Sequence, residues 1–270
     1  MQVDTQRLQL LRRVWLFSQL EDSELVTIGA VAREKTCLAG EVLVNQGDTS
    51  GDLFSVVHGR VKIASVAGGG EEILLSVLGP GDVFGEIALL DDDPRSATVV
   101  AAEPCRLLVV PRVAFRALLS QTPILALRLL ALMARQVRRL SVRTEDSASL
   151  DVRGRLAKAL LSISERFGSV GPGPNVRITL RLSQADLGQM VGATREMVNK
   201  CLREWVGSRI IKCNRGAVTM VDETRLRPIA QGQSARRKRG RAVRRKEGGQ
   251  RSGIKRDTGR PKNRRPRGDG

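Results

Sequence analysis

Aromatic residues are scarce in this chain of 270 residues. They make up 3% of the sequence and tyrosine is absent, whereas hydrophobic residues as a whole reach 41%. A hydrophobic fraction of this size is ordinary for a globular protein, so we expect packed cores of aliphatic side chains. At ~150 residues per domain, the length predicts about two domains.

Metal-binding and catalytic patterns are also missing. The cysteines Cys37, Cys105, Cys201 and Cys213 are far apart, and neither a C-x-x-C pair nor a nearby histidine accompanies them. This spacing predicts neither a metal site nor a disulfide framework. The single histidine, His58, has no catalytic partner nearby in the sequence, so we expect that the protein is not an enzyme.

Long hydrophobic runs are absent as well. No stretch of ~18 apolar residues occurs, so we expect no membrane-spanning segment. The N-terminal sequence MQVDTQRLQLLRRVWLF has neither the apolar core nor the small-residue cleavage site of a secretory signal. These features predict a cytoplasmic protein that does not associate with membranes.

Positive charge is abundant and unevenly distributed. The formal net charge is +18, and the segment from Arg236 to the C-terminus has 16 Lys/Arg against three Asp/Glu. Residues 231–270 contain almost no apolar side chains, which predicts a disordered basic tail. Such a tail binds nucleic acids by counterion release without reading their sequence.

Two regions differ in their apolar pattern. Between about residues 36 and 110, short Val/Ile/Leu runs are interrupted by glycines, which predicts a compact antiparallel β-barrel or roll. After Leu150, VRGRLAKALLSISERF predicts a helix, VRITLRL a strand and RIIKCNRGAVTMVD a hairpin with its tip near Asn214-Arg215-Gly216. Near the N-terminus, Ser23 is expected to cap a short helix.

A long helix is predicted from Pro123, in the segment PILALRLLALMARQVRRLSVRTEDSA. Its apolar residues recur at heptad spacing, which predicts a coiled-coil contact between two copies. The alternative is an amphipathic helix that packs on its own domain. The two heptad positions hold Ala126, Met133 and Leu140, and Leu130, Val137 and Thr144.

The segment LSQADLGQMVGATREMVNKCLREW predicts a helix-turn-helix. Ser183 is expected to cap the first helix, Gly192 permits the turn, and apolar residues lock the two helices together. The N-terminal part of the second helix would enter a major groove, where Arg can bond to guanine and Glu to cytosine. The residues predicted to meet DNA are Ser183, Thr194, Arg195, Glu196, Asn199 and Lys200.

Residues 84–100, FGEIALLDDDPRSATVV, combine a Gly-Glu pair, three aspartates and a Pro-Arg-Ser triplet. This segment resembles the phosphate-binding cassette of cyclic-nucleotide domains in the CRP/FNR family of transcriptional regulators, closest to the cyclic-AMP receptor branch. LDVRGRLAKALL resembles the start of that family's DNA-binding domain, and LGQMVGATREMVNKCL resembles its helix-turn-helix. The three segments occur in the family's order, and the resemblance covers about residues 15–228.

The resemblance implies an α+β fold with three parts. These are an N-terminal, jelly-roll-like cyclic-nucleotide-binding β-roll over 1–120, a long dimerisation helix over 121–147 and a winged helix-turn-helix DNA-binding domain over 148–230. The disordered basic tail over 231–270, inferred from composition, follows them. It further implies a homodimer that binds palindromic double-stranded DNA and contacts RNA polymerase.

The resemblance also assigns roles to residues of the cassette. Gly85 would present its backbone N–H to the nucleotide, Glu86 would accept a hydrogen bond from the ribose 2′-OH, and Arg95 would pair with the cyclic phosphate. Ser96 would donate to the phosphate or to a syn purine. Ile87 and Ala88 would begin a short helix whose amides point toward the phosphate. Residues 91–93 are expected in a solvated turn away from the ligand.

One position departs from the cyclic-AMP branch. An ungapped alignment of the long helix places Leu140 and Ser141 where that branch has two polar residues that contact adenine. Ser141 keeps a hydroxyl, but Leu140 cannot bond to the adenine amino group, and an unmade buried polar contact costs ~1–3 kcal/mol. The effector therefore stays open among cyclic AMP, cyclic GMP and another ligand.

Two functions remain at this point. The first is a homodimeric transcriptional regulator controlled by a cyclic nucleotide bound in the β-roll. The second is an effector-independent, nucleoid-type DNA-binding protein in which the barrel serves only for dimerisation, a hypothesis motivated by the basic tail.

Overall fold

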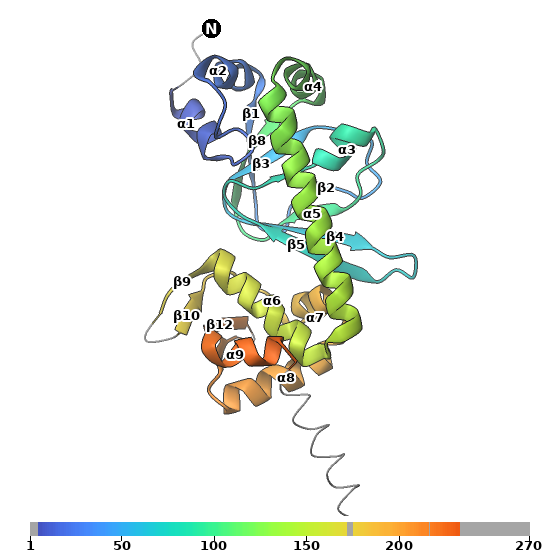
Figure 1. The fold of residues 1–270 in the computed structure, drawn as a ribbon, viewed down its shortest axis with the longest axis vertical. Coiled ribbons are helices and arrows are strands. Elements are labelled where there is room, and N and C mark those ends of the chain that lie inside the picture. Colours follow the sequence, from blue (N-terminus) through green and yellow to red (C-terminus); the bar gives the residue numbers. More distant parts are fainter. Residues whose placement is uncertain (1–4, 172–174, 216, 233–270) are drawn as a thin grey trace, which may run out of the picture.

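The computed structural model describes residues 5–171, 175–215 and 217–232. An N-terminal part of helices and two sheets is joined by one long helix, α5 (Pro123–Ser149), to a smaller C-terminal part (Figure 1). This arrangement confirms the predicted α+β fold with an N-terminal β-roll and a C-terminal winged helix-turn-helix. The predicted basic tail lies outside the described residues from position 233 onward.

The β-roll consists of two four-stranded antiparallel sheets. One has the strand order β1-β8-β3-β6 and the other the order β2-β7-β4-β5. Side chains from both sheets form a shared apolar cluster, in which the rings of Phe54 and Phe84 stack at a centroid distance of 4.8 Å. The strands are β1 (Arg33–Cys37), β2 (Val42–Val44), β3 (Leu53–His58), β4 (Val61–Val66), β5 (Glu72–Leu78), β6 (Val83–Phe84), β7 (Thr98–Ala101) and β8 (Cys105–Val110).

Helices cover the outer face of the first sheet. Leu53 of β3 and Leu108 of β8 share an apolar cluster with side chains of α1 (Thr5–Arg13), α2 (Asp22–Val31), α4 (Arg112–Gln121) and the first half of α5. The short helix α3 (Glu86–Asp91) follows β6.

The expected N-cap of α2 was wrong. The helix begins at Asp22 with Glu21 as its N-cap, and Glu24 Oε2 accepts a hydrogen bond from Glu21 N at 2.8 Å. This capping box places the N-cap two residues earlier than the predicted cap at Ser23.

Helix α5 runs along the β-roll to the C-terminal part, and it begins at Pro123 as predicted (Figure 1). Three residues of its predicted heptad seam are largely exposed: Leu130 at 64%, Val137 at 62% and Leu140 at 58%. The described part of the chain contains no single helix that is long and apolar enough to span a membrane. Only α4 and α5 taken together reach that length and composition, and they are bent by 112° at their junction.

The C-terminal part packs helices against a sheet of order β11-β12-β10-β9. The predicted hairpin is confirmed as β11 and β12, whereas the predicted strand VRITLRL is limited to its first residues, in β10. The elements are α6 (Val152–Phe167), β9 (Gly168–Val170), β10 (Asn175–Ile178), α7 (Gln184–Val191), α8 (Arg195–Gly207), β11 (Ile211–Asn214), β12 (Ala217–Asp222) and α9 (Glu223–Ala230).

Candidate functional site

A small cavity in the β-roll gathers most of the residues predicted to bind the ligand. The cavity lies where β6, α3 and the loop before β7 meet, and its volume is about 40 Å³. Apolar side chains from β2 and β7 complete its wall. The predicted residues that line it are Gly85, Ile87, Ala88, Arg95 and Ser96.

Arg95 is a buried cation beside this cavity. It is 4% exposed, and its guanidinium donates hydrogen bonds to the carbonyls of Gly85 (2.9 Å) and Asp52 (2.7 Å) and to Ser50 Oγ (3.3 Å). Burial lowers the pKa of Arg95, while the negative charges of Asp52, Glu86 and Asp48 oppose that shift. Within the described residues no carboxylate forms an ion pair with Arg95, so a buried positive charge faces the cavity without a direct counterion.

Gly85 is required by the backbone at this point. Its φ angle is +87°, which L side chains rarely adopt, and it forms the N-cap of α3. A Cβ atom here would lie 2.7 Å from the carbonyl oxygen of Asp52 and would collide with Arg95 Nη1. The glycine therefore allows the Arg95 guanidinium to reach the backbone of the cassette.

Glu86 lies next to the cavity-lining residues but points toward the long helix. It is 5% exposed, and its Oε1 accepts a hydrogen bond from Gln136 Nε2 of α5 at 2.6 Å. Its other carboxylate oxygen, Oε2, is buried and has no hydrogen-bond partner among the residues that the structure describes. Burial raises the pKa of Glu86, and the bond from Gln136 offsets only part of that effect.

Gln136 is a residue of this site that the sequence reasoning missed. It lies one helical turn before Leu140, on the face of α5 that was expected to approach the ligand. The sequence signal that could have indicated Gln136 is a polar side chain four residues before Leu140, the position expected to read the base.

The structure does not bring Ser141 and Leu140 to the cavity within one chain. Ser141 Oγ donates to the carbonyl of Val137 at 3.1 Å, and both residues lie on the exposed face of α5. The role of Ser141 in ligand binding stays a prediction.

The three consecutive aspartates do not line the cavity. Asp92 adopts a φ of +66° at the C-terminal end of α3, and its carboxylate forms ion pairs with Arg112 and with Arg116, the latter at 2.8 Å. Because both arginines belong to α4, these ion pairs attach the end of α3 to the helix that leads into α5.

The helix-turn-helix is formed by α7 and α8. Ser183 caps α7 by accepting from Asp186 N, as predicted, and Gly192 forms the turn with a φ of +60°. Leu187, Val191, Val198 and Leu202 are buried between the helices, which is the predicted core of the motif.

Helix α8 presents a polar face to solvent. Arg195, Glu196 and Lys200 are exposed, and Asn199 is partly exposed. Thr194 is the N-cap, and its hydroxyl accepts from Met197 N at 3.3 Å. A surface hollow is lined by Glu196, Asn199, Lys200 and Arg203, of which Arg203 was not predicted. The predicted base-contacting side chains are therefore grouped on one accessible face, and their contacts with DNA stay a prediction.

Comparisons with known proteins match both parts of the chain. Residues 34–122 match the family model of the cyclic nucleotide-binding domain, and residues 154–229 match that of the Crp-like helix-turn-helix domain. A CRP-like cAMP-activated global transcriptional regulator of Mycobacterium tuberculosis is 32% identical over 218 residues, which cover 81% of this chain and 97% of the relative.

Two proteins of Thermus thermophilus are also similar. Its cyclic AMP receptor protein is 32% identical over 193 residues, which cover 72% of this chain and 86% of that protein. The crystal structure of a CRP/FNR-family transcriptional regulator superposes with a TM-score of 0.62 at 25% identity, covering 74% of this chain and 98% of the other.

Proposed function

Because this chain belongs to the CRP/FNR family of transcriptional regulators, we propose that it is a homodimeric regulator whose β-roll binds a cyclic nucleotide. The ligand would change the affinity of the C-terminal domains for palindromic promoter DNA in the cytoplasm. We keep the division at residues 120, 147 and 230 into β-roll, dimerisation helix, DNA-binding domain and tail as part of this proposal, together with contact to RNA polymerase.

The observation that carries the proposal is the state of Arg95. Within the described ranges, the buried guanidinium bonds to two carbonyls and a hydroxyl and forms no ion pair, and a singly charged phosphodiester is a suitable counterion. Ser96, in the same cavity wall, would add a hydroxyl donor. Since the cavity measures about 40 Å³, well below the ~300 Å³ typical of small ligand pockets, it would have to enlarge to admit a nucleotide.

Glu86 supports the same assignment from the sugar side. Its buried Oε2 lacks a donor, and an unsatisfied buried acceptor costs about 1–3 kcal/mol. A ribose 2′-OH would supply that donor. Glu86 would then hold the sugar with one oxygen and Gln136 of α5 with the other, so that ligand binding and the position of α5 are linked through one carboxylate.

The proposal leaves open which nucleotide base the site prefers. Cyclic AMP is the first candidate, because the relatives from M. tuberculosis and T. thermophilus carry it in their names. Leu140 removes one polar group from the position that reads adenine in the cyclic-AMP branch, and Ser141 retains one. Cyclic GMP is therefore the second candidate.

The DNA side of the proposal rests on the accessible face of α8. Arg195, Glu196 and Lys200 would contact base edges, while Ser183, Thr194 and Asn199 would contact the flanking groove and backbone. Two copies related by a two-fold axis would place two α8 helices about one DNA turn apart on a palindrome.

The proposal is tested by isothermal titration of cyclic AMP and cyclic GMP into the wild-type chain and Arg95→Ala. Loss of a charge-assisted bond of about 1.5–3 kcal/mol predicts that Arg95→Ala weakens nucleotide binding roughly 10- to 150-fold. Arg116→Ala is the matched control, because Arg116 bonds to Asp92 and to the Leu89 carbonyl outside the cavity wall.

Both variants are first compared with the wild type by thermal unfolding, so that a folding defect is recognised. We expect Arg116→Ala to bind nucleotide as the wild type does. Equal nucleotide affinity of Arg95→Ala and the wild type would contradict the assignment of the cassette.

A further inference from the structure

The C-terminal domain contacts the β-roll of its own chain through β4, β5 and the turns beside them. Leu74 and Val77 of β5 belong to the same apolar cluster as Leu187 of α7 and Trp205 of α8. Polar contacts surround this apolar centre. We call the whole contact the interdomain interface; its polar residues are Arg60, Lys62, Glu72 and Asp82 on the β-roll and Arg166, Thr179, Asp186 and Gln189 on the C-terminal domain.

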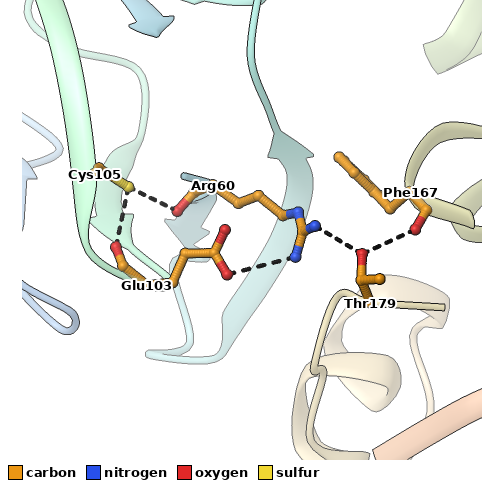
Figure 2. A network of polar contacts seen from close by, with 5 residues as sticks. All are labelled: Arg60, Glu103, Cys105, Phe167 and Thr179. Atoms are coloured by element: carbon orange, nitrogen blue, oxygen red, sulfur yellow. Dashed lines mark hydrogen bonds and ion pairs between the residues drawn. The ribbon is translucent and has the colours of Figure 1, made fainter. Parts of the chain in front are cut away.

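Arg60 is the central polar residue on one side of the interface (Figure 2). Its guanidinium pairs with Glu103 at 3.4 Å and donates to Thr179 Oγ1 of the C-terminal domain at 2.7 Å. The Thr179 hydroxyl in turn donates to the Phe167 carbonyl at 3.2 Å. Arg60 Cζ also lies 5.5 Å from the centroid of the Phe167 ring, a cation–π distance.

The β-roll holds Arg60 in place through its backbone. The Arg60 carbonyl accepts from Ala102 N at 2.9 Å and from Cys105 Sγ at 3.2 Å. The preceding residue, Gly59, has a φ of +82°, and a Cβ there would lie 2.5 Å from the Pro104 carbonyl oxygen. Arg60 therefore projects from a constrained turn toward the C-terminal domain.

Lys62 makes the second polar contact, directly to the helix-turn-helix. Its Nζ lies 2.6 Å from Asp186 Oδ1, and the two side chains are 26% and 15% exposed. Burial alone would raise the pKa of Asp186, but hydrogen bonds from Lys62 and Ser183 hold that pKa below its usual range. Because Asp186 Oδ2 also accepts from Ser183 N at 2.7 Å, Lys62 bonds to the capping box that begins α7.

Two further side chains of the C-terminal domain bond to the β-roll. Arg166 donates to the Val77 carbonyl at 2.9 Å and to Asp82 Oδ2 at 2.6 Å, and Gln189 of α7 donates to Glu72 Oε2 at 3.0 Å. None of these hydrogen bonds within the described residues involves the exposed DNA-facing side chains of α8. The interface thus fixes the domain while the recognition face stays accessible.

We propose that Arg60 and Lys62 are positioning residues for DNA recognition: they hold the C-terminal domain on the β-roll in the orientation in which α8 can enter a major groove. The inference rests on the proposed DNA-binding function. The interface matters for specificity because a palindrome is read only when two recognition helices have a fixed separation. Without it, the domain would be joined to the β-roll through the junction of α5 and α6, where Lys158 of α6 pairs with Asp146 of α5.

A role in positioning is separated from a role in stability by measuring how much the DNA affinity falls when the spacing between the two half-sites is changed. The probes are a duplex selected by the wild-type chain from a random-sequence pool, with cyclic AMP and cyclic GMP present, and the same duplex with one base pair inserted between its half-sites. The variants are Arg60→Ala, Lys62→Ala and Thr179→Val, the last removing the acceptor of Arg60 without a change of charge. Arg106→Ala, whose ion pair with Glu34 lies within the β-roll, is the matched control.

We expect the wild type and Arg106→Ala to discriminate strongly against the inserted base pair. Since one hydrogen bond contributes about 1 kcal/mol, each interface variant should lose roughly fivefold of that discrimination. Variants that discriminate as the wild type does, or that bind the selected duplex more tightly, would overturn the proposal.

Hydrogen exchange of the full chain tests the interface without DNA. Arg60→Ala, Lys62→Ala and Thr179→Val should accelerate exchange in α7 and at β5 residues 74–78, whereas Arg106→Ala should not. Unchanged exchange in all three interface variants would overturn the proposal. A wild-type chain that selects no duplex would instead contradict the DNA-binding function, and the exchange result would still decide whether these residues hold the domain.

Discussion

At the scale of single residues, Glu86 is a buried carboxyl group with only half of its hydrogen-bonding capacity used. Gln136 donates to Oε1, while no group in the described part of the chain donates to Oε2. This arrangement is unfavourable for an isolated folded chain but suits a site that receives a hydroxyl donor from a ligand.

The raised pKa of Glu86 predicts how stability depends on pH. The folded chain holds this proton more tightly than the unfolded chain, so the group contributes stability below its ordinary pKa of 4.5 and loses it as pH rises through the raised pKa. The variant Glu86→Gln has no titratable group at this position, so it does not lose this stability as pH rises. The unfolding temperature of Glu86→Gln minus that of the wild type should therefore increase as pH rises above 4.5. A difference that stays constant or falls with pH would show that burial does not raise this pKa.

Substitution of Leu140 is expected to change the preference between cyclic AMP and cyclic GMP. Leu140→Thr restores a hydroxyl where the cyclic-AMP branch reads adenine, and one added hydrogen bond of about 1 kcal/mol corresponds to roughly fivefold in affinity. Titration should show tighter binding of cyclic AMP relative to cyclic GMP. Leu130→Thr, one substitution of the same type elsewhere on the exposed face of α5, is the control. An unchanged preference in Leu140→Thr would mean that this position does not face the base.

Individual residues differed in how well they could be predicted. Gly85 and Arg95 belong to a local motif, so their positions around one cavity followed from the sequence. The contact of Glu86 with Gln136 joins residues that are 50 positions apart, and no local pattern encodes it. Asp92 was expected only to be solvated, and its ion pairs with α4 likewise depend on tertiary packing.

At the scale of elements, α5 combines two different faces. Leu125 and Leu129 are buried against the β-roll, whereas Leu130, Val137 and Leu140 are exposed. An exposed apolar stripe at heptad spacing is the surface that a second copy of the helix would cover.

Val137→Asp tests this stripe. Placing a charge in a coiled-coil seam opposes burial, so we expect the variant to shift the protein from dimer to monomer in sedimentation equilibrium. Val142→Asp is the matched control, because Val142 is 48% exposed but lies on the opposite side of α5 from the seam. If Val137→Asp sediments as the wild type and Val142→Asp do, dimerisation does not use this seam.

Helix starts could be predicted where a residue with a strong positional preference marks them. The start of α5 at Pro123 and the cap of α7 at Ser183 are two such cases. The predicted N-cap of α2 was wrong because Glu21 and Glu24 form a reciprocal capping box that competes with Ser23. The strand β10 ends at Ile178 because the chain after it turns toward α7 and no longer pairs in the sheet.

At the scale of the whole molecule, the described residues form three apolar clusters, and one of them crosses the interdomain interface. In the sequence, Arg60 and Lys62 resemble ordinary surface residues of a partly exposed strand and of the turn before it. Their partners Thr179 and Asp186 are more than 100 positions away. Such contacts depend on the docking of two domains, which the local sequence pattern does not specify.

Deletion of residues 234–270 separates the two kinds of DNA binding. The deleted segment carries a high positive charge, and counterion release makes its contribution sequence-independent and salt-dependent. We expect the shortened chain to bind mixed-sequence DNA more weakly and with a smaller salt dependence, while it keeps its footprint on a selected palindrome. Loss of the footprint together with all DNA binding would favour the nucleoid-type alternative.

The most direct test of nucleotide-controlled DNA binding is a linkage measurement. Fluorescence anisotropy would give the affinity of the wild type and of Arg95→Ala for a selected palindrome, without nucleotide and with saturating cyclic AMP or cyclic GMP. Coupling between sites of about 1–3 kcal/mol predicts that at least one nucleotide changes the wild-type affinity roughly 5- to 150-fold, and that this change is lost in Arg95→Ala. Equal DNA affinity of the wild type with and without either nucleotide would contradict the proposed regulation.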